Sequence, residues 1–288
     1  MNNNWVIVTG ADRGIGESLA GLLADMDYGV IMACRDVEKS AQVFEHIRYI
    51  TSNKDVRLMP LDLASLESVA AFVRSVDEKN YNIRALVNNA ATIRRKYERT
   101  EDGFEMTLGV NYIGTYLLTR LMMPVLKRSE GLSKVMNTVS ASIRFGRVDK
   151  DLFEDSGRKY RRLQAYRSSK LALLMFTQSL TERLGDSAGV VANAFNPGLV
   201  NTKMLTTHSW LAPLFDILVR PLLKTADQAA MQQCEALFPK KEKGGGRVYA
   251  GRRQFLIRDF AAEHKYKDWL YDQTERILRE KGYELPPL

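Results

Sequence analysis

Short apolar segments alternate with longer stretches of helical periodicity along most of the chain. The apolar segments lie at residues 5–9 (W-V-I-V-T), 30–33, 56–61, 85–87, 134–139 and 190–195. Helical patterns lie between them, at residues 17–23, 38–50, 110–126 and 170–184. Strands that are apolar throughout and separated by helices require a parallel sheet that is covered on both faces. The sequence therefore predicts an α/β fold with a doubly wound, Rossmann-like parallel sheet.

The length of the chain fits one domain. The 288 residues are 45% hydrophobic, which suits a single large α/β domain spanning residues 1–288. Residues 210–223 (W-L-A-P-L-F-D-I-L-V-R-P-L-L) are apolar but interrupted by Pro213 and Pro221, which predicts a broken helix. We expect residues 203–225 to form a C-terminal segment that covers the substrate, with packing into the core as an equally supported alternative.

A glycine-rich turn follows the first apolar segment. Gly10, Gly14 and Gly16 stand after Thr9, with Arg13 and Ile15 between them. Such a turn allows close backbone approach and directs a helix N-terminus at a pyrophosphate. The spacing differs from the usual G-x-G-x-x-G, and an ordinary strand-to-helix loop would explain the glycines alone. Their position after the first strand favours cofactor binding. The residues expected to bind the cofactor are Gly10, Arg13, Gly14, Ile15 and Gly16.

The end of the second apolar segment predicts the kind of dinucleotide. An acidic residue there would bind the ribose 2′-hydroxyl of NAD and repel a 2′-phosphate. This chain has Cys34 and then Arg35, and Arg13 offers a second cation nearby. The sequence therefore predicts NADP(H) as the cofactor. The alternative is that Arg35 is a solvated surface residue and that Asp36 binds the ribose as in NAD proteins.

Tyr166 carries the candidate chemistry. Of the twelve tyrosines, only Tyr166 has a lysine four residues later, Lys170, so the phenol and the ammonium share one helical face. A nearby ammonium stabilises a phenolate and lowers its pKa toward neutrality. Tyr166 could then exchange a proton with an alcohol or carbonyl. Taken alone, this spacing is more often a half-buried tyrosine beside a solvated lysine.

Further motifs in a fixed order make the chain resemble the short-chain dehydrogenase/reductase family over nearly its whole length. The motifs are the turn from Thr9 to Gly16, Asp62-Leu63, Asn88-Asn89-Ala90, Asn111, Ser140, Tyr166 with Lys170, and Pro197-Gly198-x-Val200-x-Thr202. The resemblance implies an oxidoreductase that interconverts a carbonyl and an alcohol. It also implies a role for each matching residue.

The implied cofactor contacts run along the chain. Asp62, with Leu63 beside it, is expected at the adenine, and Asn89 against the adenosine ribose. Pro197, Val200 and Thr202 are expected to orient the nicotinamide. Tyr166 and Lys170 are expected to contact the cofactor too, Lys170 through the nicotinamide ribose. The implied catalytic residues are Asn111, Ser140, Tyr166 and Lys170, with Asn111 holding a water that connects the lysine to solvent.

Two positions depart from the family pattern. Ala91 stands where the family usually has glycine, after Asn89 and Ala90, which could alter backbone approach to the cofactor. The catalytic serine aligns best at Ser140, and Ser142 is the alternative. Either hydroxyl could donate a hydrogen bond to a substrate oxygen on which negative charge develops.

The stretch between Ser140 and Tyr166 is longer than in the shortest family members. This lengthened loop, residues 149–163, is similar to that of the subgroup containing retinol dehydrogenases and the WW-domain oxidoreductase, which implies a lipophilic substrate. Because cells usually keep NADP reduced, we expect carbonyl reduction. A protein of the same fold that binds NADP(H) as a sensor without catalysis is the alternative function.

The net charge of +8 is spread among 34 acidic residues, and the basic clusters at residues 94–96 and 158–162 lack a nucleic-acid-binding motif. We therefore expect no nucleic-acid partner, and keep a peripheral membrane protein as a third hypothesis. No signal or transmembrane pattern and only two cysteines predict a cytoplasmic protein. Residues 110–126 and 170–184 are apolar on more than one face, and the family resemblance implies a homodimer or homotetramer built on them.

Overall fold

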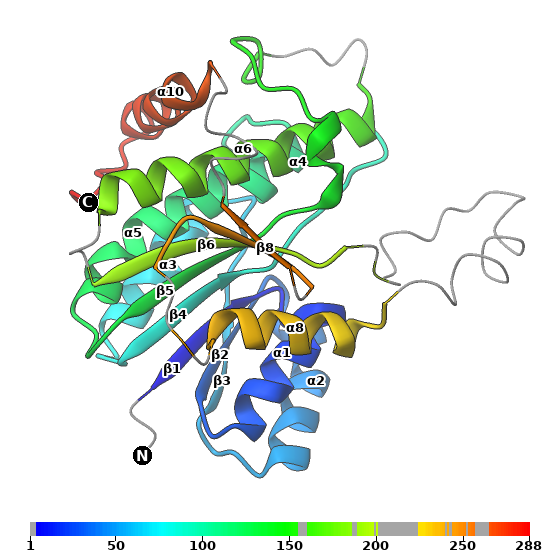
Figure 1. Ribbon diagram of the computed structural model, residues 1–288, viewed down its shortest axis with the longest axis vertical. Helices are drawn as coiled ribbons and strands as arrows, with labels where there is room; N and C mark the ends of the chain where they lie inside the picture. The colour runs from blue at the N-terminus through cyan, green and yellow to red at the C-terminus, as the bar shows by residue number, and fades with distance from the viewer. Residues whose placement is uncertain are drawn as a thin grey trace, which may run out of the picture.

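A single eight-stranded sheet forms the centre of the computed structural model (Figure 1). The structure describes residues 4–154, 160–185, 189–198, 200, 224–239, 241, 244–251, 253–256 and 265–288. The strand order is β3-β2-β1-β4-β5-β6-β7-β8, and only β8 runs antiparallel to its neighbour. The strands are β1 (Trp5–Thr9), β2 (Gly29–Cys34), β3 (Val56–Pro60), β4 (Ile83–Asn88), β5 (Ser133–Thr138), β6 (Val190–Asn196), β7 (Arg247–Ala250) and β8 (Arg253–Leu256).

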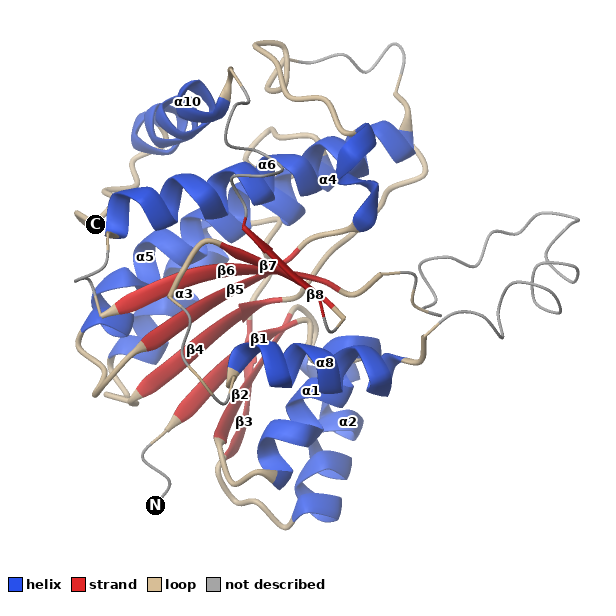
Figure 2. Ribbon diagram, viewed as in Figure 1, coloured by secondary structure: helices blue, strands red, loops and turns tan. Residues whose placement is uncertain are grey.

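Helices cover both faces of this sheet (Figure 2). One face packs against α1 (Gly14–Asp25), α2 (Val37–Thr51) and α8 (Ala226–Leu237), and the other against α3 (Leu66–Asp77), α5 (Thr115–Lys127) and α6 (Arg162–Leu184). Each face has its own cluster of buried apolar side chains, as expected for strands that are apolar on both sides. A further helix, α10 (Lys267–Glu280), lies outside α6.

The strand order places the candidate site. The chain builds outward from β1 to β2 and β3, then returns to β4 on the other side of β1. In doubly wound sheets, ligands bind beyond the carboxyl ends of the strands at the point where the order reverses. The turn after β1 and the segment after β4 meet at this point.

The predicted fold class is confirmed, and the six predicted strands agree with β1 to β6 to within two residues at each end. Two short strands, β7 and β8, and three helices, α3, α8 and α10, were not predicted. The predicted helix at residues 110–126 begins in the structure as a short α4 (Met106–Leu108) and a π-helix, η1 (Gly109–Gly114), which continue into α5. The helix carrying Tyr166 begins at Arg162, eight residues before the predicted start at Lys170.

Two predicted segments fall partly outside the described residues. Of the proposed substrate-covering segment at 203–225, only Lys224 and Thr225 are described. Of the lengthened loop at 149–163, residues 155–159 are not described, and the last two residues already belong to α6. None of the helices within the described ranges is long and apolar enough to span a membrane.

Candidate active site

Ser140 and Tyr166 come together beyond the carboxyl end of β5. Ser140 follows this strand and caps a 3-10 helix, η2 (Ala141–Phe145), which packs against the first turns of α6. The Ser140 hydroxyl forms a hydrogen bond with the phenol of Tyr166. Its oxygen lies 3.0 Å from that of Ser142 and also accepts a hydrogen bond from the Ser142 backbone N–H. The structure therefore places Ser140 between Tyr166 and Ser142.

The sequence predicts that Lys170 lowers the pKa of Tyr166, but in the structure the surroundings of the phenol favour its protonated form. Burial raises the pKa of Tyr166, and the hydrogen bond from Ser140 opposes this rise only in part. A phenol with a raised pKa keeps its proton at neutral pH. In this state a phenol is able to donate a proton.

Lys170 lies one helical turn after Tyr166 and is almost completely buried, with 1% of its surface exposed. Its Nζ donates a hydrogen bond to the backbone carbonyl of Thr138 at 2.7 Å. Among the described residues, no carboxylate pairs with this amine. Burial therefore lowers the pKa of Lys170 to about 7, so that the amine is close to half-protonated at neutral pH.

Asn111 lies in the π-helix η1 and is fully buried. Its Oδ1 accepts from the backbone N–H of Thr92 at 2.7 Å, and its Nδ2 donates to the Thr92 carbonyl at 2.9 Å and to Ser169 Oγ at 3.0 Å. Both amide hydrogens are thus used, and one lone pair of Oδ1 is left to accept from a water. The side chain joins the segment after β4 to α6.

The glycine turn after β1 leaves no room for side chains. Gly10 has a backbone φ of +63°, a conformation that favours glycine. A Cβ on Gly16 would lie 2.2 Å from the Gly10 carbonyl oxygen and 2.6 Å from Asn89 Nδ2. That Asn89 amide donates to the Thr9 carbonyl at 3.1 Å, so the segment after β4 supports the turn. This close packing fits a backbone cradle for a pyrophosphate.

The N-terminus of α1 opens onto the same turn. Arg13 is the capping residue and is exposed, and no side chain of the described residues caps the first turn, which contains Gly14 and Ile15. The N-terminal N–H groups of a helix and its dipole favour an anion at this position. The residues present therefore fit the phosphates of a dinucleotide.

Arg35 and Asp36 differ in exposure and in hydrogen bonding. Arg35 is exposed at the end of β2. The Asp36 carboxylate caps α2, since it accepts from the Lys39 backbone N–H at 3.1 Å and pairs with Lys39 Nζ at 2.5 Å. These hydrogen bonds lower the pKa of Asp36. Asp36 is thus occupied by its own helix, whereas Arg35 points its charge into solvent beside the cradle.

Asp62 and Leu63 form the turn after β3. Asp62 is half-buried, and its Oδ1 accepts from the Ala64 backbone N–H at 2.9 Å. Leu63 is buried, with 5% of its surface exposed. Asp62 therefore orders this turn at the same edge of the sheet as the glycine cradle.

The segment after β6 is attached to a residue that the sequence reasoning missed. Lys224 Nζ donates to the Pro197 carbonyl at 3.3 Å, and the Lys224 backbone pairs with that of the buried Val200. Thr202 lies outside the described residues. No spacing rule connects Lys224 with Pro197 because they are 27 residues apart. The only local signal is the capping box of Thr225 and Gln228 that begins α8 immediately after Lys224.

A buried polar network joins the strands behind the site, and its extent was not predicted from the sequence. Asn88 Nδ2 donates to Asn137 Oδ1 at 2.7 Å and to Thr119 Oγ1 at 2.9 Å. Asn137 Nδ2 donates in turn to Thr177 Oγ1 at 2.8 Å. The network connects β4 and β5 with α5 and α6, and so fixes the helix that carries Tyr166 relative to the sheet.

Tyr160 anchors the loop before α6. Its hydroxyl donates to the Arg94 carbonyl at 3.3 Å and to Glu105 Oε1 at 3.1 Å, and lies 3.1 Å from Thr107 Oγ1. Burial raises the pKa of Tyr160 to about 12. Arg94 is also paired with Glu98 at 3.4 Å. Tyr160 is therefore attached to the first basic cluster through Arg94, and Glu98 compensates part of the charge of that cluster.

Comparisons with known proteins point in one direction. A family model described as short chain dehydrogenase matches residues 4–210. Retinol dehydrogenase 13 of Homo sapiens is 40% identical over 98% of this chain and 85% of that protein, and its Mus musculus counterpart is 38% identical over 95% and 83%. Retinol dehydrogenase 12 of Homo sapiens is 34% identical over 95% of this chain and 85% of that protein.

Solved structures have the same fold. An uncharacterized protein from Mycobacterium paratuberculosis superposes with a TM-score of 0.74 and 29% identity, over 99% of this chain and 95% of the other. A short chain dehydrogenase from Shigella flexneri, solved in complex with NADP, superposes with a TM-score of 0.68 and 22% identity, over 88% and 98%. The second similarity is informative for the fold alone.

Proposed function

Because the chain belongs to the short-chain dehydrogenase family, within the subgroup of the retinol dehydrogenases, we propose that this oxidoreductase uses NADP(H) to interconvert a carbonyl and an alcohol, with Tyr166 as acid and base. The observation that carries this proposal is the Tyr166 phenol, hydrogen-bonded to Ser140 one turn before the buried Lys170. These three groups can hold an oxygen atom and exchange a proton with it.

The residues of the site divide the work of the reaction. In carbonyl reduction, Tyr166 donates its proton to the substrate oxygen while Ser140 donates a hydrogen bond to the same atom. The ammonium form of Lys170, held by the Thr138 carbonyl, stabilises the phenolate that remains. Asn111 keeps one acceptor site for a water through which the proton can be replaced. The bound nicotinamide supplies or accepts the hydride.

Several observations support NADP(H). Arg35 is exposed at the end of β2, and the Asp36 carboxylate is engaged in capping α2. Arg13 adds a second cation at the turn, although it is paired with Asp12 at 2.9 Å. We expect Arg35 to bind the 2′-phosphate.

A lipophilic substrate is supported by the relatives and by the rim of the site. Retinol, a lipophilic alcohol, gives the most similar relatives their name. Two apolar side chains are exposed on the elements that carry Ser140 and Tyr166: Phe145 of η2 is 68% exposed and Leu163 of α6 is 49% exposed. Because cells usually keep NADP reduced, reduction is the direction we propose.

Nicotinamide absorbance tests this function. We expect turnover of lipophilic aldehydes, ketones or quinones with NADPH and a higher KM for NADH. Tyr166→Phe should lower kcat by roughly 10²-fold or more and leave NADPH binding intact. Arg35→Ser should raise the KM for NADPH by about tenfold, as for a lost charge-assisted hydrogen bond, and leave that for NADH nearly unchanged. A preference for NADH would refute the cofactor assignment, and tight NADPH binding without turnover would favour the sensor.

The homodimer or homotetramer and the cytoplasmic location remain predictions. The outer side of α6 is covered by α10, so an interface between copies has to include α10 or lie elsewhere. Light scattering tests the oligomer, and a clean monomer would count against it. Cell fractionation tests the location.

A further inference from the structure

Helix α8 brings two consecutive glutamines to the edge of the sheet where the candidate active site lies. Gln233 is fully buried, and its Nε2 donates to Thr138 Oγ1 at 3.0 Å. Gln232 is half-buried, and its Oε1 accepts from Lys224 Nζ at 2.8 Å. Neighbouring residues of a helix are about 100° apart, so the two side chains serve different partners.

Gln233 connects α8 to Lys170 through Thr138. Thr138 is the last residue of β5, with its side chain held by Gln233 and its backbone carbonyl accepting from Lys170 Nζ at 2.7 Å. A single residue thus receives one hydrogen bond from each side of the sheet. Any displacement of Thr138 would displace the only hydrogen-bond acceptor that the described residues give to the Lys170 amine.

Gln232 connects α8 to the segment after β6 through Lys224. Lys224 donates both to Gln232 and to the Pro197 carbonyl, and its backbone pairs with Val200. Pro197, Gly198 and Val200 are the described residues of the segment expected at the nicotinamide. Lys224 is therefore fixed by α8 on one side and holds this segment on the other.

We propose that Gln233 and Gln232 are positioning residues, Gln233 holding Thr138 so that its carbonyl orients Lys170, and Gln232 holding Lys224 so that it fixes the Pro197 segment. The proposal rests on the function proposed above. It assigns to α8, on the far side of the sheet from α6, the alignment of two walls of one site. The proposal has two arms. The first arm, Gln233 with Thr138, should affect catalysis, and the second arm, Gln232 with Lys224, should affect NADPH binding.

A buried glutamine elsewhere provides the matched control. Gln178 of α6 is 5% exposed, and its Nε2 donates to Glu182 Oε1 at 2.9 Å. The Oε1 atoms of Gln178 and Gln233 are both buried without a hydrogen-bond partner among the described residues. Gln178 lies more than two helical turns beyond Lys170, so a change there disturbs packing similarly but not Thr138.

For the first arm we expect Gln233→Met to lower kcat about threefold to tenfold, in line with the loss of one hydrogen bond. The pKa that governs alcohol oxidation should rise, because a displaced ammonium stabilises the Tyr166 phenolate less. Thr138→Val should give the same two changes, and the double variant no more than either one. Thr138→Ser, which keeps the hydroxyl, should restore the wild-type pH profile, and Gln178→Met should leave kcat and the profile unchanged.

For the second arm, Lys224→Met and Gln232→Met should weaken NADPH binding about threefold to tenfold, measured by the fluorescence of the bound nucleotide. The pH profile should stay as in the wild type. A wild-type kcat and pH profile in Gln233→Met, or equal effects in Gln178→Met, would overturn the first arm. Unchanged NADPH affinity in Lys224→Met would overturn the second.

Two readouts keep this test separate from the test of the proposed function. Failure of the function means that the wild-type protein turns over no substrate of the panel. In that case NADPH affinity still tests the second arm. The first arm is then tested by a double-mutant cycle of Gln233→Met and Thr138→Val, in which urea unfolding measures the free energy of unfolding. A coupling free energy near zero would overturn it. If Gln233→Met does not fold, the comparison of Thr138→Val with Thr138→Ser carries the first arm.

Discussion

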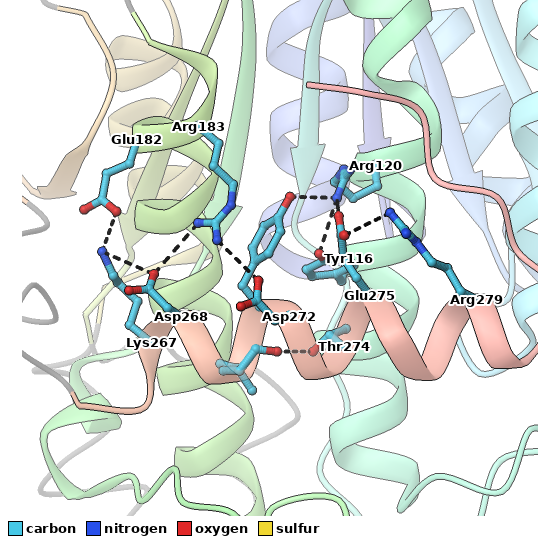
Figure 3. Close-up of polar contacts among 12 residues, drawn as sticks. Tyr116, Arg120, Glu182, Arg183, Lys267, Asp268, Asp272, Thr274, Glu275 and Arg279 are labelled. Carbon is cyan, nitrogen blue, oxygen red and sulfur yellow. Dashed lines mark hydrogen bonds and ion pairs between the residues drawn. The ribbon is translucent and has the colours of Figure 1, made fainter.

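Two cations are buried on the same face of the sheet and are treated in opposite ways. Lys170 of α6 is 1% exposed and Arg120 of α5 is 3% exposed. Lys170 donates to a single backbone carbonyl. Arg120 donates to the Glu275 carboxylate, to Tyr271 Oη at 2.6 Å and to the Pro286 carbonyl at 2.7 Å. Figure 3 shows Arg120 and Glu275 pointing at one another between α5 and α10.

The consequence is a difference in titration. Burial lowers the pKa of Lys170 to about 7. Burial also acts to lower the pKa of Arg120, but Tyr271, Tyr116 and Glu275 outweigh it and raise that pKa. A buried charge that is paired with a carboxylate serves the fold, whereas one that lacks a carboxylate keeps its field available for another group. In the mechanism proposed above, Lys170 acts on Tyr166.

The region around Arg120 attaches α10 through several polar contacts (Figure 3). Arg183 of α6 pairs with Asp272 at 3.5 Å, and Lys267 pairs with Glu182. Tyr112 and Thr274 share a hydrogen bond of 2.8 Å. These contacts fix α10 across the outer sides of α5 and α6, which would otherwise expose apolar surface.

The largest effect is expected when the charge of Lys170, the cation assigned to function, is removed. Lys170→Met removes the charge beside Tyr166, and kcat/KM for carbonyl reduction should fall by about 10²-fold to 10⁴-fold. The free energy of unfolding should stay the same or increase, because an incompletely compensated buried amine is removed. Activity assays and urea unfolding measure the two quantities. An enzyme within tenfold of wild-type activity would contradict the role assigned to Lys170.

The next largest effect is expected when the charge of Arg120, the cation assigned to the fold, is removed. Arg120→Met takes the buried partner from the half-buried Glu275 carboxylate and leaves it the exposed Arg279 at 3.3 Å, so the free energy of unfolding should fall by at most about 3 to 5 kcal/mol. The kcat of the folded fraction should remain that of the wild type. Replacing Glu275 as well should recover part of the loss. A large loss of kcat with little loss of stability would erase the distinction between the two cations.

The smallest effect is a dependence of stability on pH. In the unfolded chain Lys170 keeps its proton up to about 10.5, whereas in the folded chain it loses it near 7. Between these values the unfolded state binds more protons, so stability gained from this group rises with pH by at most about 1.4 kcal/mol per unit. Unfolding of the wild type and Lys170→Met from pH 7 to 9 isolates this term. Parallel curves would contradict the lowered pKa.

The parallel core of the fold was accessible from the sequence because its strands are apolar on both faces. β7 has only four residues, with Arg247 at its start, and β8 contains Arg253 and Gln254, so neither has an apolar run of sufficient length. The pattern of α10 was overlooked although Leu270, Tyr271, Thr274 and Leu278 are buried at helical spacing. Here the signal was present.

The site was predictable only where its geometry is local. Tyr166 and Lys170 are four residues apart on one helix, and the spacing itself brings them together. The carbonyl of Thr138 that receives the Lys170 amine, and the Gln233 that holds Thr138 from 95 residues away, depend on the order of strands in the sheet. Sequence spacing carries no information on such contacts. The contacts of Ser140 with Tyr166 and Ser142 likewise depend on how η2 packs against α6.

The π-helix Gly109–Gly114 ties the function of this region to the exact length of the chain. A π turn holds one residue more than an α turn, so deletion of a single residue would convert it to continuous α-helix. Every side chain before the deletion would then rotate by about 100° about the helix axis relative to α5. Asn111 would leave either Thr92 or Ser169, which it now bonds simultaneously. A change in the number of residues here would therefore break one of these two contacts.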